Sequence, residues 1–447
     1  MSVSLDNLAP YIAAKQAEKK VVQTGRDETP TLSKAMETKK LRGGSEQEIS
    51  VRNGDQATNT KFYNPDDPVS DFVGSVAGEN NYTAIQPVVK LKFAWSFNGT
   101  DLRYSGIQLQ QYKTAGDAQL ASYLDDRLEF SEEEARESIG SGIINGTGNG
   151  YQGTLAGVVG TNLVNPYGLI YQDRNFSGTP NANTSNAADN THFGQPRHLH
   201  SELVGNVLNA TTGYGTTIAD TGTFVVGSTE ISGLASTVFT PQLGWEIWVD
   251  FGAGFEHLGR EYVVADADTA AATTLQMSTI FRGVAGSYPV EFRAPFNVAT
   301  HGAAGVLTTA KLNKLYFQCS DGKRSPTQIN SDTTTFGAVS NFLVDVARWN
   351  LVKDADFAAK GYNNFMYQNA TWCADNNYTR GTIQYLTGKH TNLYCLRGQD
   401  DYMIKASDLI ELPSQAGYKQ FGANTTMAFQ MVSESPRSNG IINGLDI

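Results

Sequence analysis

The clearest pattern of hydrophobic and polar positions is an alternation over "VVKLKFAWSFNG", residues 88–99. Successive side chains of a β-strand point to opposite faces, so this segment predicts a strand with one apolar face. That face carries Val89, Leu91, Phe93, Trp95 and Phe97. A second candidate strand, "EQEISVR", covers 46–52, and turn-forming residues fill the interval, which predicts a long β-hairpin over 45–105. Because a lone hairpin is marginal in water, its apolar face should pack against something else.

The pattern changes to a helical period over 112–139, where charged residues cover the surface around one apolar stripe. The stripe consists of Leu120, Leu124, Leu128, Ala135 and Ile139. Gly140 and Gly142 follow, and we interpret them as the end of this helix. The glycines of "NGTGNGYQG", residues 145–153, thus come after a helix, whereas a dinucleotide-binding loop has them after a strand. We therefore predict a turn at 145–153 and no phosphate site.

Four short strands are predicted within 221–280, where turn formers separate four runs rich in β-branched and aromatic residues. The runs are "TFVV", "GWEIWVDFG", "REYVVADAD" and "TTLQM". We expect them to form a compact β module.

Residues 305–395 mix helices and strands. The first predicted helix has Thr308 as its N-cap and one apolar face made of Leu312, Leu315, Tyr316 and Cys319. The second has Ser331 or Asp332 as its cap and a stripe made of Phe336, Val339, Leu343 and Val346. Strands are expected at "PTQIN", "ATWCAD", "GTIQYL" and "NLYC".

Charge narrows the classes of function. Only 18% of the residues are charged and the formal net charge is −11, which argues against a nucleic-acid grip as the main task, since such a grip needs clustered Lys and Arg. No apolar run approaches the ~18 residues of a membrane span, and the N-terminus lacks the apolar core of a signal peptide. The mildly basic residues 1–44 read as an arm, with a short helix over 8–20 and a pattern broken at Pro30. This arm is either a solvated tail or a strap laid on a neighbour or near a polyanion.

A search for chemistry finds no active site. His198 and His200 would share one side of a strand, but only Glu202 lies near them, so a metal-ligand set is not completed. Asp400 and Asp401 are neighbours in sequence, and side chains of neighbouring residues usually point apart, which argues against a carboxylate dyad. The cysteines are widely spaced and are expected to be reduced and buried. We therefore predict no catalytic, cofactor-binding or metal-binding residues, no cofactor and no enzymatic activity.

Three stretches, taken in order, resemble the major capsid proteins of tailed bacteriophages, the Hong Kong 97-like fold. "GDAQLASYLDDRLEFSEEEARESIGSGIINGTGNGYQGTLAGV" resembles that family's spine helix and the turn that follows it. "GVLTTAKLNKLYFQCSDGKRSPTQINSDTTTFGAVSNFL" resembles the helix, strand and helix of its axial domain. "TWCADNNYTRGTIQYLTGKHTNLY" resembles the strand–Asp–turn–strand that ends that domain.

This resemblance implies an α+β chain of six parts: an N-terminal arm (1–44), an extended β-hairpin loop (45–105), a peripheral domain with the spine helix (106–220), a β-rich insertion (221–280), an axial α/β domain (281–410) and C-terminal strands that return to the peripheral or axial domain (411–447). Its implied function is to self-assemble as hexamers and pentamers into the icosahedral head around the genome. The apolar face from Val89 to Phe97 would then contact a neighbouring subunit.

The same resemblance implies the partners and the location. Partners would be other copies of the chain, a scaffolding protein, a portal and a decoration or cement protein, with double-stranded DNA packaged inside without sequence-specific binding and with no membrane. The protein would belong to the virion capsid and be assembled in the host bacterial cytoplasm. Two alternatives stay open: an encapsulin-type compartment shell of the same fold, and a secreted β-rich adhesin or glycan-binding protein.

Overall fold

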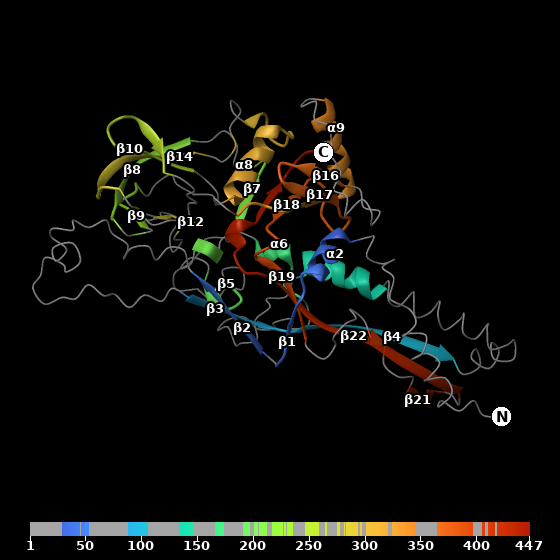
Figure 1. The fold of residues 1–447 in the computed structure, drawn as a ribbon. Coiled ribbons are helices and arrows are strands. Elements are labelled where there is room, and N and C mark those ends of the chain that lie inside the picture. Colours follow the sequence, from blue (N-terminus) through green and yellow to red (C-terminus); the bar gives the residue numbers. More distant parts are fainter. Residues whose placement is uncertain are drawn as a thin grey trace, which may run out of the picture.

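The computed structural model shows a mixed α/β chain in which several sheets and few helices are described (Figure 1). The described residues are 29–44, 46–52, 88–105, 134–146, 166–173, 191–196, 201–203, 205–211, 217–226, 228, 230–235, 246–258, 264–265, 275–277, 281, 283–293, 296, 301–320, 324–345, 364–396, 405–406, 410–415 and 418–447. The predicted helix at 8–20, most of the predicted helix at 112–139, and the segments around Asp400 and His198 lie outside these residues.

The first sheet, here called the long sheet, is organised by the 16-residue strand β22 (Tyr418–Ser433). Strand β4 (Ser96–Ser105) pairs with it antiparallel over ten residue pairs, from Ser96 with Phe429 to Ser105 with Gln420. The remaining strands are β1 (Lys40–Arg42), β19 (Thr391–Leu396), β20 (Lys405–Ala406) and β21 (Ile410–Gln415). Figure 1 shows β22 and β4 running side by side away from the helices.

The predicted hairpin strands pair as expected in their described parts. β2 (Glu46–Arg52) and β3 (Val88–Ala94) form an antiparallel pair in register from Glu46 with Ala94 to Arg52 with Val88. The second predicted strand is interrupted at Trp95, where the chain leaves β3 and enters β4. Residues 53–87, the predicted tip of the hairpin, lie outside the described residues.

The second sheet, here called the α/β sheet, has six strands in the order β16-β17-β15-β18-β23-β7. Their bounds are β16 Asn364–Tyr367, β17 Ala370–Ala374, β15 Gln328–Ser331, β18 Ile383–Leu386, β23 Gly440–Asn443 and β7 Asn206–Asn209. Helices α8 (Thr309–Cys319) and α9 (Thr333–Asp345) contribute to its hydrophobic core, which centres on the fully buried Trp372.

Both helices of this region begin as predicted. Thr308 caps α8, its side chain accepting a hydrogen bond from the backbone N–H of Lys311. At α9 the cap is Asp332, which accepts from the N–H groups of Thr334 and Thr335. The predicted apolar face of α8 is buried, and Val339 and Leu343 of α9 are fully buried, whereas Val346 lies outside the described residues.

A third sheet of seven strands lies at one side of the molecule in Figure 1, and we call it the insertion sheet. Its order is β11 (Phe255–His257), β10 (Glu246–Asp250), β14 (Gly286–Arg293), β8 (Thr217–Phe224), β9 (Glu230–Ser232), β13 (Leu275–Gln276) and β12 (Val264–Ala265). The four predicted runs all contribute strands. The sequence did not reveal β14, the strand that joins β10 to β8, because it contains Pro289, and proline argues against a central strand. Pro289 is tolerated because the β10 pairing ends at Val290.

The prediction that Gly140 and Gly142 end the long helix is wrong. Residues 134–145 are helical, so the helix runs through both glycines. A Cβ atom at Gly140 would lie 2.8 Å from Cγ2 of Thr29, and one at Gly142 would lie 2.8 Å from Cγ of Pro166. The two glycines therefore allow the helix to pack closely against Thr29 and Pro166 of the same chain.

Helix α2 (Pro30–Glu37) packs on the same helix, in a core shared with the long sheet. The interpretation of Pro30 as a break in the pattern is also wrong, since α2 begins at this residue. Proline at the first helical position costs no hydrogen bond, because that N–H has no partner within the helix. The remaining short elements are α6 (Leu169–Gln172), β5 (Thr191–His192), β6 (Gln195–Pro196), η5 (Ser201–Leu203) and η6 (Pro436–Ser438).

Candidate assembly interface

The apolar face predicted on residues 88–99 is buried within its own chain for four of its five members. Exposed fractions are 7% for Val89, 0% for Leu91, 1% for Phe93 and 5% for Trp95. They pack with side chains from distant parts of the chain, and Phe93 alone has ring contacts to Phe193 at 6.0 Å and to Tyr394 at 5.2 Å between centroids.

The reason for assigning these four residues to a subunit contact is therefore wrong. The alternation identifies the correct face, but these side chains pack in a hydrophobic core of their own chain. Trp95 shows how firmly the strand is held, because its indole N–H also donates to the backbone carbonyl of Gly44 at 2.7 Å. Side chains this buried are not available to a neighbour.

Phe97 is the one member that stays available, with 64% of its surface exposed. It lies on β4, opposite Ala428 of β22, beyond the point where the chain changes sheet at Trp95. Contact between Phe97 and a second subunit remains a prediction.

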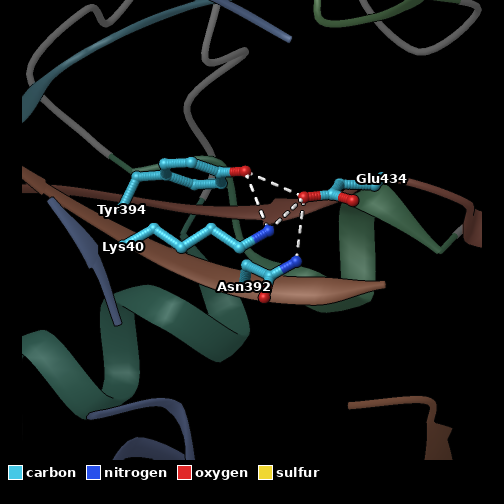
Figure 2. Close-up of polar contacts among 4 residues, drawn as sticks. All are labelled: Lys40, Asn392, Tyr394 and Glu434. Carbon is cyan, nitrogen blue, oxygen red and sulfur yellow. Dashed lines mark hydrogen bonds and ion pairs between the residues drawn. The ribbon is translucent and has the colours of Figure 1, made fainter. Parts of the chain in front are cut away.

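The N-terminal segment is tied to the long sheet by four polar side chains (Figure 2). Glu434 Oε1 accepts from Lys40 Nζ at 2.9 Å, from Asn392 Nδ2 at 2.9 Å and from Tyr394 Oη at 2.8 Å. Burial raises the pKa of Tyr394 above its ordinary value, and the neighbouring Glu434 carboxylate raises it further. The phenol therefore stays protonated and keeps donating to Glu434. We call these four residues the Glu434 cluster.

A second polar tie holds α2 to the turn after β17. The Asp375 carboxylate is fully buried and accepts from Thr31 Oγ1 at 2.7 Å and from the Thr31 backbone N–H at 3.4 Å. Thr31 lies in the first turn of α2, whose N-cap residue Thr29 makes no side-chain cap hydrogen bond. Asp375, 344 positions away in sequence, instead accepts from an N–H group of that turn. Burial raises the pKa of Asp375, and hydrogen bonds from Thr31 and Asn377 oppose this rise.

Neither tie could be predicted from the sequence. In the Glu434 cluster, Lys40 lies 394 positions before Glu434, and Asn392 lies 42 positions before it. Asp375 appears in the sequence only as part of the strand–Asp–turn–strand stretch. No spacing rule connects such positions, because only the order of strands in the sheets brings them together.

The candidate metal and acid residues do not form a described site. His198, His200, Asp400 and Asp401 lie outside the described residues, and Glu202 accepts a hydrogen bond from Ser435 Oγ at 3.0 Å. Within the described part of the chain, no group of three His, Cys, Asp or Glu side chains is placed to hold a metal ion. The three cysteines are buried and form no disulfide, as predicted. No helix among the described residues has the length and hydropathy that a membrane crossing requires.

Comparison with known proteins gives matches only among solved structures. No family model matches the sequence, and no curated protein matches it. The asymmetric unit of the cyanophage A-1(L) capsid has a TM-score of 0.47 and 10% identity, covering 94% of this chain and 93% of that one. The chain resembles phage capsid proteins.

Two further matches have similar coverage. The capsid of the native GTA particle has a TM-score of 0.41 and 9% identity, covering 92% of this chain and 89% of that one. The holo-SrpI encapsulin complex from Synechococcus elongatus PCC 7942 has a TM-score of 0.45 and 9% identity, covering 97% and 95%.

Proposed function

We propose that this chain is the major capsid protein of a tailed double-stranded DNA bacteriophage. Copies of it assemble as hexamers and pentamers into the icosahedral head that encloses the genome. In this proposal the working parts are the extended strands and the N-terminal segment, and the function requires no catalytic residue.

The observation that carries the proposal is the ladder of β4 and β22. Ten residue pairs at about 3.4 Å per residue make a ladder roughly 34 Å long. The β22 side chains that the structure describes begin at Met427, and those from Met427 to Val432 include members of two hydrophobic cores. The rest of the ladder leads away from the helices in Figure 1. A subunit that overlaps its neighbours in a shell needs such an extension. The exposed Phe97 lies at the start of the β4–β22 ladder.

The N-terminal segment supports the same proposal. Asp375 and the Glu434 cluster fix α2 and β1 on the rest of the chain. The point at which the N-terminal arm joins the folded chain, Thr29, is therefore fixed as well. From there an arm can reach a neighbouring subunit as a strap. The net charge of −11 suits a container wall, because an acidic protein does not bind tightly to packaged DNA.

In this proposal, the partners are other copies of the chain, a scaffolding protein, a portal and a decoration or cement protein. The protein resides in the virion and is assembled in the cytoplasm of the host bacterium. An encapsulin-type shell would use the same extensions, and neighbouring genes separate the two: terminase and portal genes accompany a phage capsid, whereas a cargo enzyme accompanies a compartment.

The proposal predicts that the purified chain, expressed with its neighbouring genes, forms closed particles in negative-stain micrographs. Deletion of residues 60–85, in the predicted hairpin tip, should leave soluble subunits that form no shells, because the overlap between neighbours is lost. Deletion of 181–190, a polar loop by composition, is the control and should leave shells intact. A wild-type chain that stays monomeric at high concentration would contradict the proposed function, and normal shells from the 60–85 deletion would contradict the role of the hairpin.

A further inference from the structure

Four basic side chains gather around strand β19 of the long sheet, and we call Lys40, Arg42, Arg324 and Lys389 the basic patch. Lys40 and Arg42 lie on β1, which pairs with β19. Lys389 lies in the turn before β19, and Arg324 lies in the segment before β15. Arg42, Arg324 and Lys389 are exposed, and the side chain of Lys40 is 42% exposed. These positive charges therefore reach the solvent.

Hydrogen bonds hold the segments of the basic patch together. The Gly388 N–H donates to Thr327 Oγ1 at 2.9 Å, which ties the turn before β19 to the segment before β15. The Glu434 N–H donates to the carbonyl of His390 at 2.7 Å, and the Glu434 carboxylate accepts from Lys40. The same turn is thereby tied to β1, so the four cations keep a defined arrangement.

Two titratable side chains respond to this concentration of charge. Burial lowers the pKa of His390, and three members of the basic patch, all but Arg42, lower it further, while Glu434 opposes them. Burial and the Glu434 carboxylate raise the pKa of Tyr394, whereas Arg42 lowers it. All four members of the patch thus act on the two side chains that β19 and its preceding turn place between them.

Acidic side chains offset only part of the positive charge. Glu434 pairs with Lys40, and Glu202 accepts a hydrogen bond from the serine that follows Glu434. Glu37 and Glu48, on neighbouring segments, each pair with a lysine outside the patch. With Glu434 and Glu202 both counted, cations still outnumber carboxylates among the described side chains here, although the whole chain carries −11.

A dense polyanion is the partner that fits such a patch. Double-stranded DNA carries one negative charge per roughly 1.7 Å of helix axis. A second copy of this chain is a poorer match, because its 45 acidic residues are interspersed with 34 basic ones. The patch also adjoins the arm, since residues 1–44 carry eight basic and five acidic side chains. We propose that the basic patch contacts the phosphate backbone of the packaged DNA and so marks the inner face of the shell. This inference rests on the proposed shell function.

DNA binding by the unassembled full-length chain tests the contact. Fluorescence anisotropy of a labelled duplex of about 30 base pairs is measured between 0.05 and 0.2 M salt. Each lost phosphate contact makes the slope of log K against log salt shallower by about 0.9, so Arg324→Gln/Lys389→Gln should change it by about 1.8 and weaken binding at 0.05 M by roughly tenfold or more. Lys92→Gln/Arg380→Gln is the matched control, because it removes the same charge from exposed positions outside the patch and should change neither quantity.

Closed particles supply the second readout. They should not bind duplex added from outside, because the patch faces inward. Equal slopes for the two double variants, or particles that bind added duplex as tightly as the unassembled chain, would overturn the inference and leave the shell function standing. Polyglutamate that competes as well as DNA at equal charge would assign the patch to an acidic protein segment and overturn it too. Absence of any particles from the wild-type chain, expressed with its neighbouring genes, would overturn both.

Discussion

Phe93 lies at the centre of the contacts that hold the β2–β3 pair to the body of the chain. Its ring approaches Trp95 at 5.7 Å and Tyr394 at 5.2 Å between centroids, and only 1% of its surface is exposed. Phe97, four residues further on, has 64% of its surface exposed. The same residue type thus serves the stability of the subunit at one position and is available to a neighbour at the other.

This contrast predicts opposite outcomes for two equal truncations. Phe93→Ala should lower the free energy of unfolding by about 3–5 kcal/mol, because it leaves a cavity in a packed core. Phe97→Ala should change it by less than about 0.5 kcal/mol, since the side chain is exposed, yet it should reduce the yield of shells. Urea denaturation and particle counts in micrographs measure the two effects. Equal loss of stability in both variants would contradict the assignment.

At the scale of elements, one ion pair joins the insertion sheet to the α/β region. Lys314 of α8 pairs with Glu246 Oε1 of β10, and Glu246 Oε2 accepts from Trp248 Nε1 at 3.2 Å. The side chains of Lys314 and Glu246 are only 10% and 20% exposed. Burial lowers the pKa of Lys314, and the Glu246 carboxylate opposes that shift. Because both charges are largely removed from water, each depends on the other for compensation.

Removing one partner of the Lys314–Glu246 ion pair should lower the free energy of unfolding. Lys314→Met leaves the Glu246 carboxylate without its cation, and we expect a loss of about 3–5 kcal/mol in the free energy of unfolding. Lys34→Met is the matched control, because Lys34 and Glu37 form an ion pair with side chains 44% and 38% exposed, and exposed pairs contribute about 0–1 kcal/mol. The double variant Lys314→Met/Glu246→Leu should recover part of the loss. Urea denaturation of all four chains is the measurement, and similar losses from both single variants would refute the role of the pair.

At the scale of the whole molecule, the net charge of −11 acts on every encounter between copies. In the proposed shell, assembly has to overcome this repulsion before short-range contacts form. An exposed uncharged side chain such as Phe97 can meet a second copy without adding to this repulsion.

Assembly should therefore be faster at higher salt. Raising the ionic strength from 0.01 M to 0.15 M shortens the screening length from about 30 Å to about 8 Å and weakens the repulsion between copies. Light scattering of the purified chain should show a faster initial rise at 0.15 M. Sucrose at equal osmolarity is the control and should not reproduce the effect. A slower rise at 0.15 M would show that attraction between charges, and not apolar contact, drives assembly.

The sequence by itself determined the local features of this protein. The alternation around Leu91 identified a strand and its buried face, and the positions of Thr308 and Asp332 identified where two helices begin. These features could be predicted because a strand or a helix cap depends on residues only a few positions apart.

Only the tertiary structure decided what each face packs against. The hairpin face is covered by Phe193 and Tyr394, Gly140 lies against Thr29, and Lys40 reaches Glu434 across 394 positions of sequence. Periodicity indicates which face of a strand or helix is buried. It does not indicate what that face packs against, because the partner depends on the order in which distant strands join the sheets. For that reason the sequence correctly predicted the apolar face of β3 and wrongly assigned its burial to a second subunit.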